Sequence, residues 1–177
     1  MIMDPVISLT ALLLLSFVFV IAGLHKREDR VFFEATLSGY EIVPPRLTAP
    51  LSRIIPWLEI GGGIALLVPP LRAVALAIVG GLLLVYSVAI AVNLLRGRND
   101  IDCGCAGPGM QQNLSGFLLL RNSLLGLAWL VAMLGGVRPL VWLDWVVVAA
   151  ATALACAAWT TINLLLANRD KLLALRR

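Results

Sequence analysis

Charged residues are scarce in this sequence, and their scarcity is the first constraint on its fold. Asp, Glu, Lys and Arg make up 14% of the 177 residues, whereas apolar residues make up 60%. A water-soluble domain of this length needs more polar surface than these residues provide. Because each membrane crossing takes about 20 residues, the chain has room for four or five helices. We therefore expect an integral membrane protein with a single domain over residues 1–177.

Histidine and cysteine are scarce as well. One His and three Cys make a poor zinc site or disulfide framework, so any cysteine chemistry has to come from a local pair. No segment resembles a nucleotide, haem or flavin motif, and we expect no cofactor and no bound metal. The net charge of +4 comes from basic clusters beside apolar segments. This pattern is typical of orientation signals and lipid contacts, so we expect no nucleic-acid partner.

Five long apolar segments predict an all-α, multi-pass transmembrane bundle. Pro69 and Pro70 separate the second segment from the third, and because proline cannot continue a hydrogen-bonded helix, they predict a tight helical hairpin. If the first or the last segment does not cross, four helices are the alternative. The predicted spans cover residues 5–24, 51–68, 71–95, 114–134 and 139–167.

The segment 25–50, after the first span, is too long for a turn and too polar to cross a bilayer. Val31, Phe33 and Leu37 belong to a short apolar face, which predicts an interfacial helix lying on the membrane. We expect Gly39 to end this helix.

Basic residues lie mostly on one side of a chain with five spans. Twelve of the 14 Lys and Arg residues fall on that side, and Arg72 and Arg138 fall on the other. The positive-inside rule therefore predicts that the N-terminus is outside. It places the first and third connections and the C-terminus in the cytoplasm.

Reactive groups cluster in the predicted loop 96–113, where the sequence reads Asp102-Cys103-Gly104-Cys105. A disulfide between cysteines two residues apart needs a bent backbone, which Gly104 permits, and it would be easily reduced. Easy reduction favours an exchanging redox pair. Two alternatives stay open: two thiolates that hold a soft metal such as Cu(I) or half of a cluster that bridges a dimer, and two inert cysteines in a loop.

Glu59 and Arg121 are charged residues inside apolar segments. Each lies about six residues from the same membrane face, at a depth of about 9 Å for a helix that rises 1.5 Å per residue. The two side chains can therefore form an intramembrane pair, which either locks two helices together or supports proton movement beside the thiols. Asn93 and Asn122, near the same depth, would extend the pair into a polar network.

Several of these motifs resemble the MauE family of methylamine utilisation proteins, which is related to the DoxX group of redox-associated membrane proteins. The resemblance extends from about His25 to Leu130. The matching features are His25-Lys26, Tyr40 followed by Pro44, Pro56-Trp57-Leu58-Glu59, Asn93-Leu94-Leu95-Arg96-Gly97-Arg98, Ile101-Asp102-Cys103-Gly104-Cys105-Ala106-Gly107 and Arg121-Asn122.

The resemblance implies a bacterial cytoplasmic-membrane protein that assists the maturation of an exported, disulfide-rich client, such as the small (beta) subunit of methylamine dehydrogenase. It also implies a thioredoxin-like partner of the MauD type. Cys103 and Cys105 would be the exchanging pair, supported by the polar positions Glu59, Asn93, Arg121 and Asn122. This role puts the thiols near the periplasm, whereas the charge count puts them in the cytoplasm. Whether the exchange is an enzymatic activity stays open.

Two other functions compete with redox exchange. A non-catalytic scaffold would hold the thioredoxin-like partner or the client subunit against the bilayer, and it would still work after serine replaces Cys103 or Cys105. A carrier of protons or small solutes would depend on Glu59 and Arg121, and it would show transport in reconstituted vesicles.

Overall fold

The computed structural model describes residues 3–98, 101, 114–136 and 138–174. Most of these residues are helical, which confirms the predicted all-α class. Within the described ranges, the β interaction is an isolated bridge between Met3 and Gly135. The helices are α1 (Pro5–Glu28), α2 (Arg30–Gly39), α3 (Pro45–Ala65), the 3-10 helix η1 (Pro69–Leu71), α4 (Arg72–Leu95), α5 (Gly116–Met133) and α6 (Trp142–Ala174).

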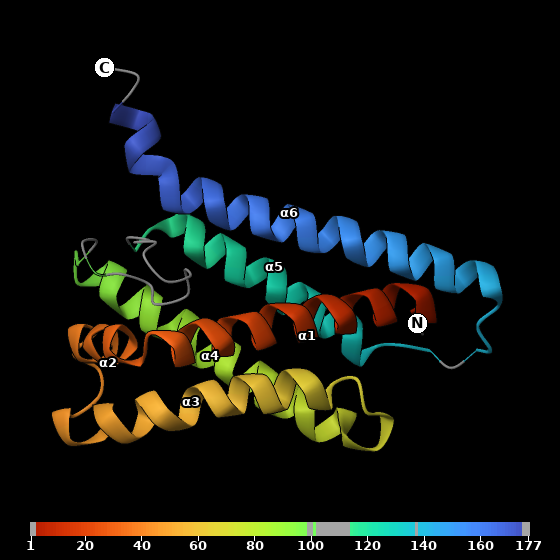
Figure 1. Cartoon of the computed structure of the whole chain (residues 1–177), viewed down its shortest axis with the longest axis horizontal. Coiled ribbons are helices and arrows are strands. Elements are labelled where there is room, and N and C mark those ends of the chain that lie inside the picture. Colours follow the sequence, from red (N-terminus) through yellow and green to blue (C-terminus); the bar gives the residue numbers. More distant parts are fainter. Residues whose placement is uncertain (1–2, 99–100, 102–113, 137, 175–177) are drawn as a thin grey trace.

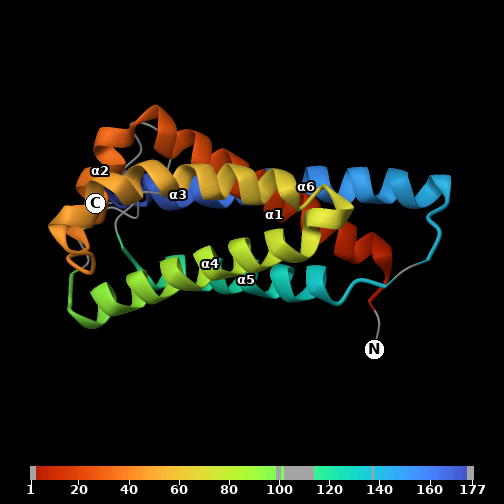
Figure 2. The same cartoon turned by 90° about the horizontal axis from the view of Figure 1, so that it is seen from below.

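The five long helices run along one axis with alternating directions (Figure 1). The N-terminal end of α1 and the C-terminal end of α6 lie at opposite ends of the bundle. Seen from below, α1, α3 and α6 form one layer and α4 and α5 form a second (Figure 2). The short helix α2 lies at the end of the bundle where α1 finishes and α3 begins.

The described residues include four helices that are long and apolar enough to cross a membrane, so the chain is a multi-pass membrane protein. These candidate spans are Pro5–Glu28, Pro69–Leu95, Gly116–Met133 and Trp142–Asn168. The helix α3 is not among them, although it lies antiparallel to α1 and α4. Its charged residues Arg46, Arg53 and Glu59 lower its hydropathy. A fifth crossing, by α3, therefore stays a prediction.

Three helices extend beyond a predicted apolar segment at one end: α1 and α6 at their C-terminal ends and α3 at its N-terminal end. The first helix continues past residue 24 to Glu28, and α3 begins at Pro45, where proline suits the first helical turn. The segment predicted to be interfacial contains the helix α2, which starts after Asp29, whose side chain accepts a hydrogen bond from the Phe32 amide. That α2 lies on the membrane surface stays a prediction. Hydropathy marks only the apolar part of a helix, whereas caps and prolines determine where it starts.

The core of the bundle forms around α1, which packs against α3, α5 and α6. Its buried residues, including Leu15, meet Leu66 and the α4 residues Ala75 and Val79. Glycine permits close packing between α4 and α5: a β-carbon at Gly80 would lie 2.6 Å from the Trp129 ring. These contacts fix α4 and α5 as a pair on one side of α1.

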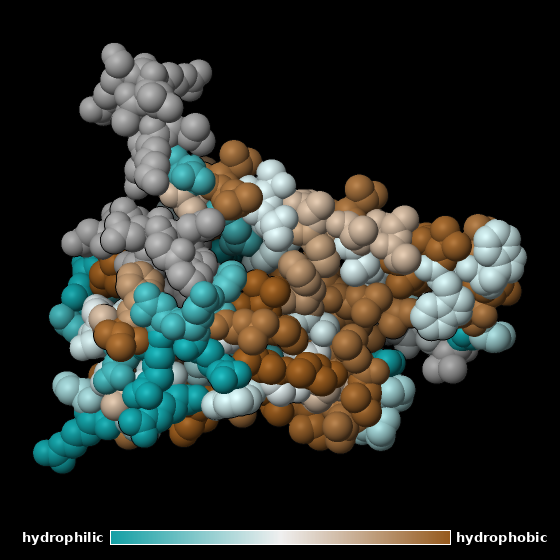
Figure 3. All heavy atoms as spheres, viewed as in Figure 1, coloured by the Kyte–Doolittle hydropathy of each residue, from teal (hydrophilic) through white to brown (hydrophobic). Residues whose placement is uncertain are grey.

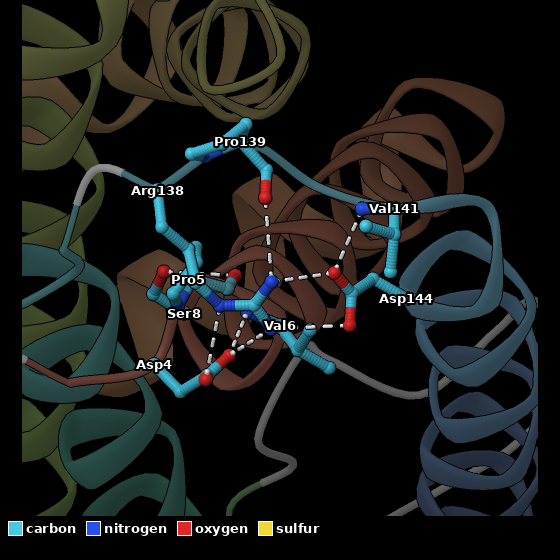
Figure 4. Close-up of polar contacts among 8 residues, drawn as sticks. All are labelled: Asp4, Pro5, Val6, Ser8, Arg138, Pro139, Val141 and Asp144. Atoms are coloured by element: carbon cyan, nitrogen blue, oxygen red, sulfur yellow. Dashed lines mark hydrogen bonds and ion pairs between the residues drawn. The ribbon is translucent and has the colours of Figure 1, made fainter.

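An ion cluster joins the start of α1 to the start of α6 at the N-terminal end of the bundle (Figure 4). The Arg138 guanidinium lies 3.3 Å from an Asp4 oxygen and 2.6 Å from an Asp144 oxygen. The Asp4 side chain also accepts a hydrogen bond from the Val6 amide, and this bond, together with Arg138, lowers the pKa of the Asp4 carboxyl. The cluster thus ties together two helices that are far apart in the sequence.

Polar and apolar surfaces separate along the bundle axis. Hydrophilic residues gather at the end that carries α2, whereas hydrophobic residues cover the middle (Figure 3). A second apolar cluster, made of Tyr40, Ile90, Leu114 and Leu118, lies beneath that polar end, and Ile101 packs against it. If α3 also crosses, the positive-inside rule predicts that this end faces the cytoplasm.

Candidate functional site

A buried ion pair joins α1 to α3. The Lys26 Nζ atom lies 2.6 Å from Glu59 Oε1, and the two side chains are 2% and 1% exposed. The Tyr86 hydroxyl of α4 donates a second hydrogen bond, of 2.7 Å, to the same carboxylate oxygen. The Lys26 ammonium also lies 5.1 Å from the centre of the Tyr86 ring, within the range of a cation–π contact. Three helices therefore meet at one carboxylate.

Two glycines allow α1 and α3 to approach closely enough for this pair. A β-carbon at Gly23 would lie 2.8 Å from the Pro56 carbonyl oxygen, and one at Gly63 would lie 2.8 Å from Val20. Because residues three apart share a face of a helix, Gly23 places Lys26 on the face of α1 that meets α3. Small residues serve this purpose in membranes, where lipid gives no hydrophobic drive for helix association.

A second polar group joins α5 to α6. Arg121 donates a 2.8 Å hydrogen bond to Asn163 Oδ1, and its guanidinium carbon lies 5.3 Å from the centre of the Trp159 ring. Asn163 in turn donates to the Trp159 carbonyl oxygen one turn earlier in α6. Arg121 is only 5% exposed, so its charge is held inside the protein by side chains of α6.

A cavity of about 400 Å³ connects the two polar groups. Its lining comes from α1, α3, α4, α5 and α6, and it includes Lys26, Glu59, Tyr86, Arg121 and Asn163. The rest of the wall is mainly apolar and aromatic. The cavity is therefore an apolar chamber with a polar end, which is the usual character of a small-molecule site.

The sequence-predicted polar residues occupy different places. Glu59, Arg121 and Asn122 line the cavity together. Asn122 lies near Ser87 of α4, with a long donor–acceptor distance of 3.5 Å. Asn93 is fully buried elsewhere on α4 and donates to the Ala89 carbonyl oxygen. The cavity lining does not include it.

Glu59 was predicted to pair with Arg121, and the structure shows which groups surround its carboxylate. Its close ion partner is Lys26, and a direct pair with Arg121 stays a prediction. Because α3 begins at Pro45 and not at residue 51, Glu59 lies farther along its helix than the apolar segment indicated. Both residues nevertheless line the same cavity, as does Asn122, whereas Asn93 does not. The predicted polar network of all four residues stays a prediction.

Four residues in the contacts of Glu59 and Arg121 were not identified as site residues from the sequence. They are Lys26, Tyr86, Trp159 and Asn163. Lys26 belongs to the segment 25–50, which was predicted to be interfacial, and its spacing of three residues from Gly23 is the signal that could place it on a packed face. Asn163 is a polar residue inside the last apolar segment, where polar side chains usually find a partner.

Cys103 and Cys105 lie outside the described residues, so the redox and Cu(I) interpretations of this pair stay predictions. The residues on either side of their segment are described. The Leu114 amide donates a 3.0 Å hydrogen bond to the Ile101 carbonyl oxygen, and both residues pack in the cluster with Tyr40 and Leu118. Arg98 also forms a 2.8 Å ion pair with Glu41, which follows α2. The cysteine segment therefore begins and ends at the α2 end of the bundle.

Comparisons with known proteins agree with one another. The family model described as methylamine utilisation protein MauE matches residues 3–138, which leaves α6 outside the match. A MauE protein of Methylophilus methylotrophus is 38% identical over 134 residues, covering 75% of this chain and 70% of that protein. A MauE protein of Methylorubrum extorquens is 33% identical over 141 residues, covering 77% of this chain and 76% of that protein.

A third relative, a MauE protein of Paracoccus denitrificans, is 33% identical over 122 residues, covering 69% of this chain and 66% of that protein. No solved structure matches the chain. The family model covers well over half of the sequence, and the first two relatives exceed 30% identity over more than two thirds of their own length. The chain therefore belongs to the MauE family of methylamine utilisation membrane proteins.

Proposed function

We propose that this protein is an accessory protein of methylamine utilisation in the bacterial cytoplasmic membrane, whose Cys103 and Cys105 exchange thiol and disulfide with a partner. The client would be an exported protein such as the small subunit of methylamine dehydrogenase. Family membership supports the pathway, because the relatives are named methylamine utilization proteins. The observation that carries the redox part is the anchoring of Ile101 and Leu114, which holds both ends of the cysteine segment against the bundle.

The exchange itself needs only the two thiols and a partner disulfide. A thiolate attacks one sulfur of the partner disulfide, a mixed disulfide forms, and the other partner sulfur leaves as a thiolate. The second cysteine then attacks the mixed disulfide, which forms the Cys103–Cys105 bond and releases the reduced partner. The same steps in reverse would oxidise a thioredoxin-like partner of the MauD type. Two electrons move in either direction, and no other reactant is needed.

The polar groups of the bundle would support this chemistry without taking part in it. The Lys26–Glu59–Tyr86 cluster holds α1, α3 and α4 together. The Arg121–Asn163 contact holds α5 against α6. Since α4 precedes the cysteine segment and α5 follows it, these contacts fix the two helices on which the thiols depend.

Single serine substitutions test the redox proposal. We expect Cys103→Ser or Cys105→Ser to abolish client activity, while the amount of membrane protein stays unchanged. An alkylation-shift assay in cells should show both oxidised and reduced forms of the wild-type pair. Cys156→Ser is the matched control, because Cys156 is a half-buried free thiol within α6, and it should leave client activity unchanged. Full client activity in both test variants would reject the exchange.

A scaffold function has one observation in its favour. Val31 on α2 is 82% exposed and Leu47 on α3 is 50% exposed, although both are apolar, so the α2 end offers apolar surface for a partner domain. This alternative predicts that Val31→Ser with Leu47→Ser abolishes client maturation while the cysteine variants retain it. The same client assay separates the two functions.

A further inference from the structure

The wall of the intramembrane cavity is unusually suited to a flat ring. Phe17 and Phe19 of α1 and Trp159 of α6 line it together with Tyr86 of α4. Aromatic side chains pair with flat rings in stacked or edge-to-face arrangements, which add to the energy of apolar burial. A volume of about 400 Å³ accommodates one ring with a few attached groups.

The polar end of the same cavity supplies hydrogen-bond donors. Arg121 and Asn122 line it, and both side chains are about 5% exposed. A guanidinium and an amide present N–H groups, whose natural partners are carbonyl oxygens. Donors inside an apolar chamber favour a ligand whose oxygens accept hydrogen bonds but whose body is apolar.

The cavity reaches the outer surface of the bundle beside α6. Thr160 and Leu164 line it, and both are exposed. They lie within the candidate span Trp142–Asn168, so this surface faces lipid. A ligand would therefore enter from the bilayer, and a long apolar tail could remain in the lipid while the head occupies the cavity.

We infer that this cavity binds a membrane-soluble quinone, a flat ring with two carbonyl oxygens on an apolar tail. The aromatic wall fits the ring, the Arg121 and Asn122 donors fit a carbonyl oxygen, and the opening beside α6 fits the tail. A phospholipid fits less well, because its charged headgroup belongs at the membrane surface and it carries two chains. A fatty acid has no ring to contact the aromatic wall.

The binding itself depends only on described residues of the bundle, whereas its use as an electron acceptor rests on the proposed function. Oxidation of two thiols to one disulfide releases two electrons and two protons. Reduction of one quinone to its quinol takes up two electrons and two protons, which form its two hydroxyl groups. One quinone per disulfide therefore balances the reaction.

Tryptophan fluorescence of the purified full chain in detergent tests the binding. The probe is ubiquinone with a decyl tail, which quenches a nearby indole. We expect saturable quenching, and we expect Trp159→Phe to lose most of the saturable part. Trp142→Phe is the matched control on the same helix, because Trp142 is 77% exposed and does not line the cavity. The Trp142→Phe protein should retain the saturable part of the quenching. Equal, unsaturable quenching in all proteins would overturn the inference.

Filling the cavity with a bulky side chain tests whether the quenching comes from quinone bound inside it. Ala22 lines the cavity, and Ala22→Phe should weaken decyl-ubiquinone binding at least tenfold. Ala77→Phe makes the same change on an exposed face of α4 and should leave binding unchanged. Equal affinity in the two variants would place the quinone elsewhere. Oleate is the competing probe, and saturable binding of oleate without saturable binding of the quinone would also overturn the inference.

The cysteine variants separate this inference from the proposed function. We expect the protein with Cys103→Ser and Cys105→Ser to bind decyl-ubiquinone with unchanged affinity. That result together with full client activity in cells would reject thiol exchange and leave the quinone site standing. Cysteines that cycle in cells, in a protein that binds no quinone, would reject only the quinone site.

Discussion

Lys26 shows how the meaning of one residue depends on its surroundings. In the sequence it belongs to a basic cluster beside a membrane span, where lysine commonly reaches toward the interface. In the structure its ammonium is buried against Glu59 and near the Tyr86 ring. A buried ion pair adds little stability over apolar side chains, but removing one partner leaves an uncompensated charge. The pair is therefore sensitive to single substitutions.

Substitution of Lys26 should destabilise the protein markedly. We expect Lys26→Met to lower the free energy of unfolding by about 3–5 kcal/mol, because Glu59 then stays buried without its cation. Thermal or denaturant unfolding of the purified protein in detergent measures this change.

The double variant Lys26→Met with Glu59→Gln provides the control, since it removes both charges. It should recover part of the lost stability, and the coupling between the two positions follows from the double-mutant cycle. Arg30→Met, which breaks the exposed pair with Glu34, should change stability by less than about 1 kcal/mol. A Lys26→Met protein as stable as the Arg30→Met protein would contradict the buried pair.

At the scale of helices, small residues determine which faces pack. Gly80 and Gly81 are neighbours in α4, yet their surroundings differ. A β-carbon at Gly80 would lie 2.6–2.8 Å from atoms of the Trp129 ring, whereas one at Gly81 would meet nothing within 4 Å. Trp129 is also held by its indole N–H, which donates a 2.8 Å hydrogen bond to the Leu76 carbonyl oxygen. Gly80 therefore belongs to the α4–α5 contact and Gly81 to the outer surface.

Alanine at these two glycines should have opposite effects. We expect Gly80→Ala to destabilise the protein by about 1–3 kcal/mol, because the added methyl group overpacks the contact with Trp129. Gly81→Ala should leave stability unchanged or raise it by up to about 1 kcal/mol, since alanine favours a helix over glycine. Unfolding curves of both variants in the same detergent measure the difference. Equal destabilisation by the two changes would contradict this packing of α4 on α5.

The sequence predicted the existence of the helices better than their limits. The proline pair Pro69-Pro70 correctly marked the turn between two helices, because its effect on the backbone is local. The start of α3 at Pro45 was missed, since its first turns carry polar and charged residues that hydropathy does not detect. Whether such polar turns become helical depends on what packs against them, and here α2 packs against α3.

At the scale of the whole molecule, the two ends of the bundle differ in composition. The α2 end is hydrophilic (Figure 3) and contains the residues that flank the cysteine segment. The opposite end contains the ion cluster of Asp4, Arg138 and Asp144 (Figure 4). The long helices α1, α3, α4, α5 and α6 alternate in direction, so the start of α1 and the end of α6 lie at opposite ends of the bundle (Figure 1). The orientation therefore decides which compartment the cysteines face.

Cysteine labelling should resolve this orientation. In a protein whose native cysteines are replaced by serine, Val141→Cys marks the Asp4 end and Ile42→Cys marks the α2 end. Both positions are exposed, at 57% and 44%. Because the basic residues favour a cytoplasmic α2 end, we expect a membrane-impermeant thiol reagent to label Val141→Cys in intact cells. It should label Ile42→Cys only after permeabilisation.

The reverse pattern would place the cysteine segment in the periplasm, where the family role expects it. Labelling of both positions from the same side would show that the two ends do not lie across the membrane from each other. That result would contradict the crossing by α3.

The sequence by itself determined that the protein belongs in a lipid bilayer, that it is helical and which family it resembles. Apolar composition and local motifs do not depend on how the chain packs. It also identified Glu59, Arg121 and Asn122 as polar residues inside apolar segments, since burying such groups is costly at any position. Only the tertiary structure decided that Lys26 pairs with Glu59, and that α6 brings Trp159 and Asn163 to Arg121. Partners from helices far apart in the sequence meet through packing, and local patterns contain no record of which helix faces which.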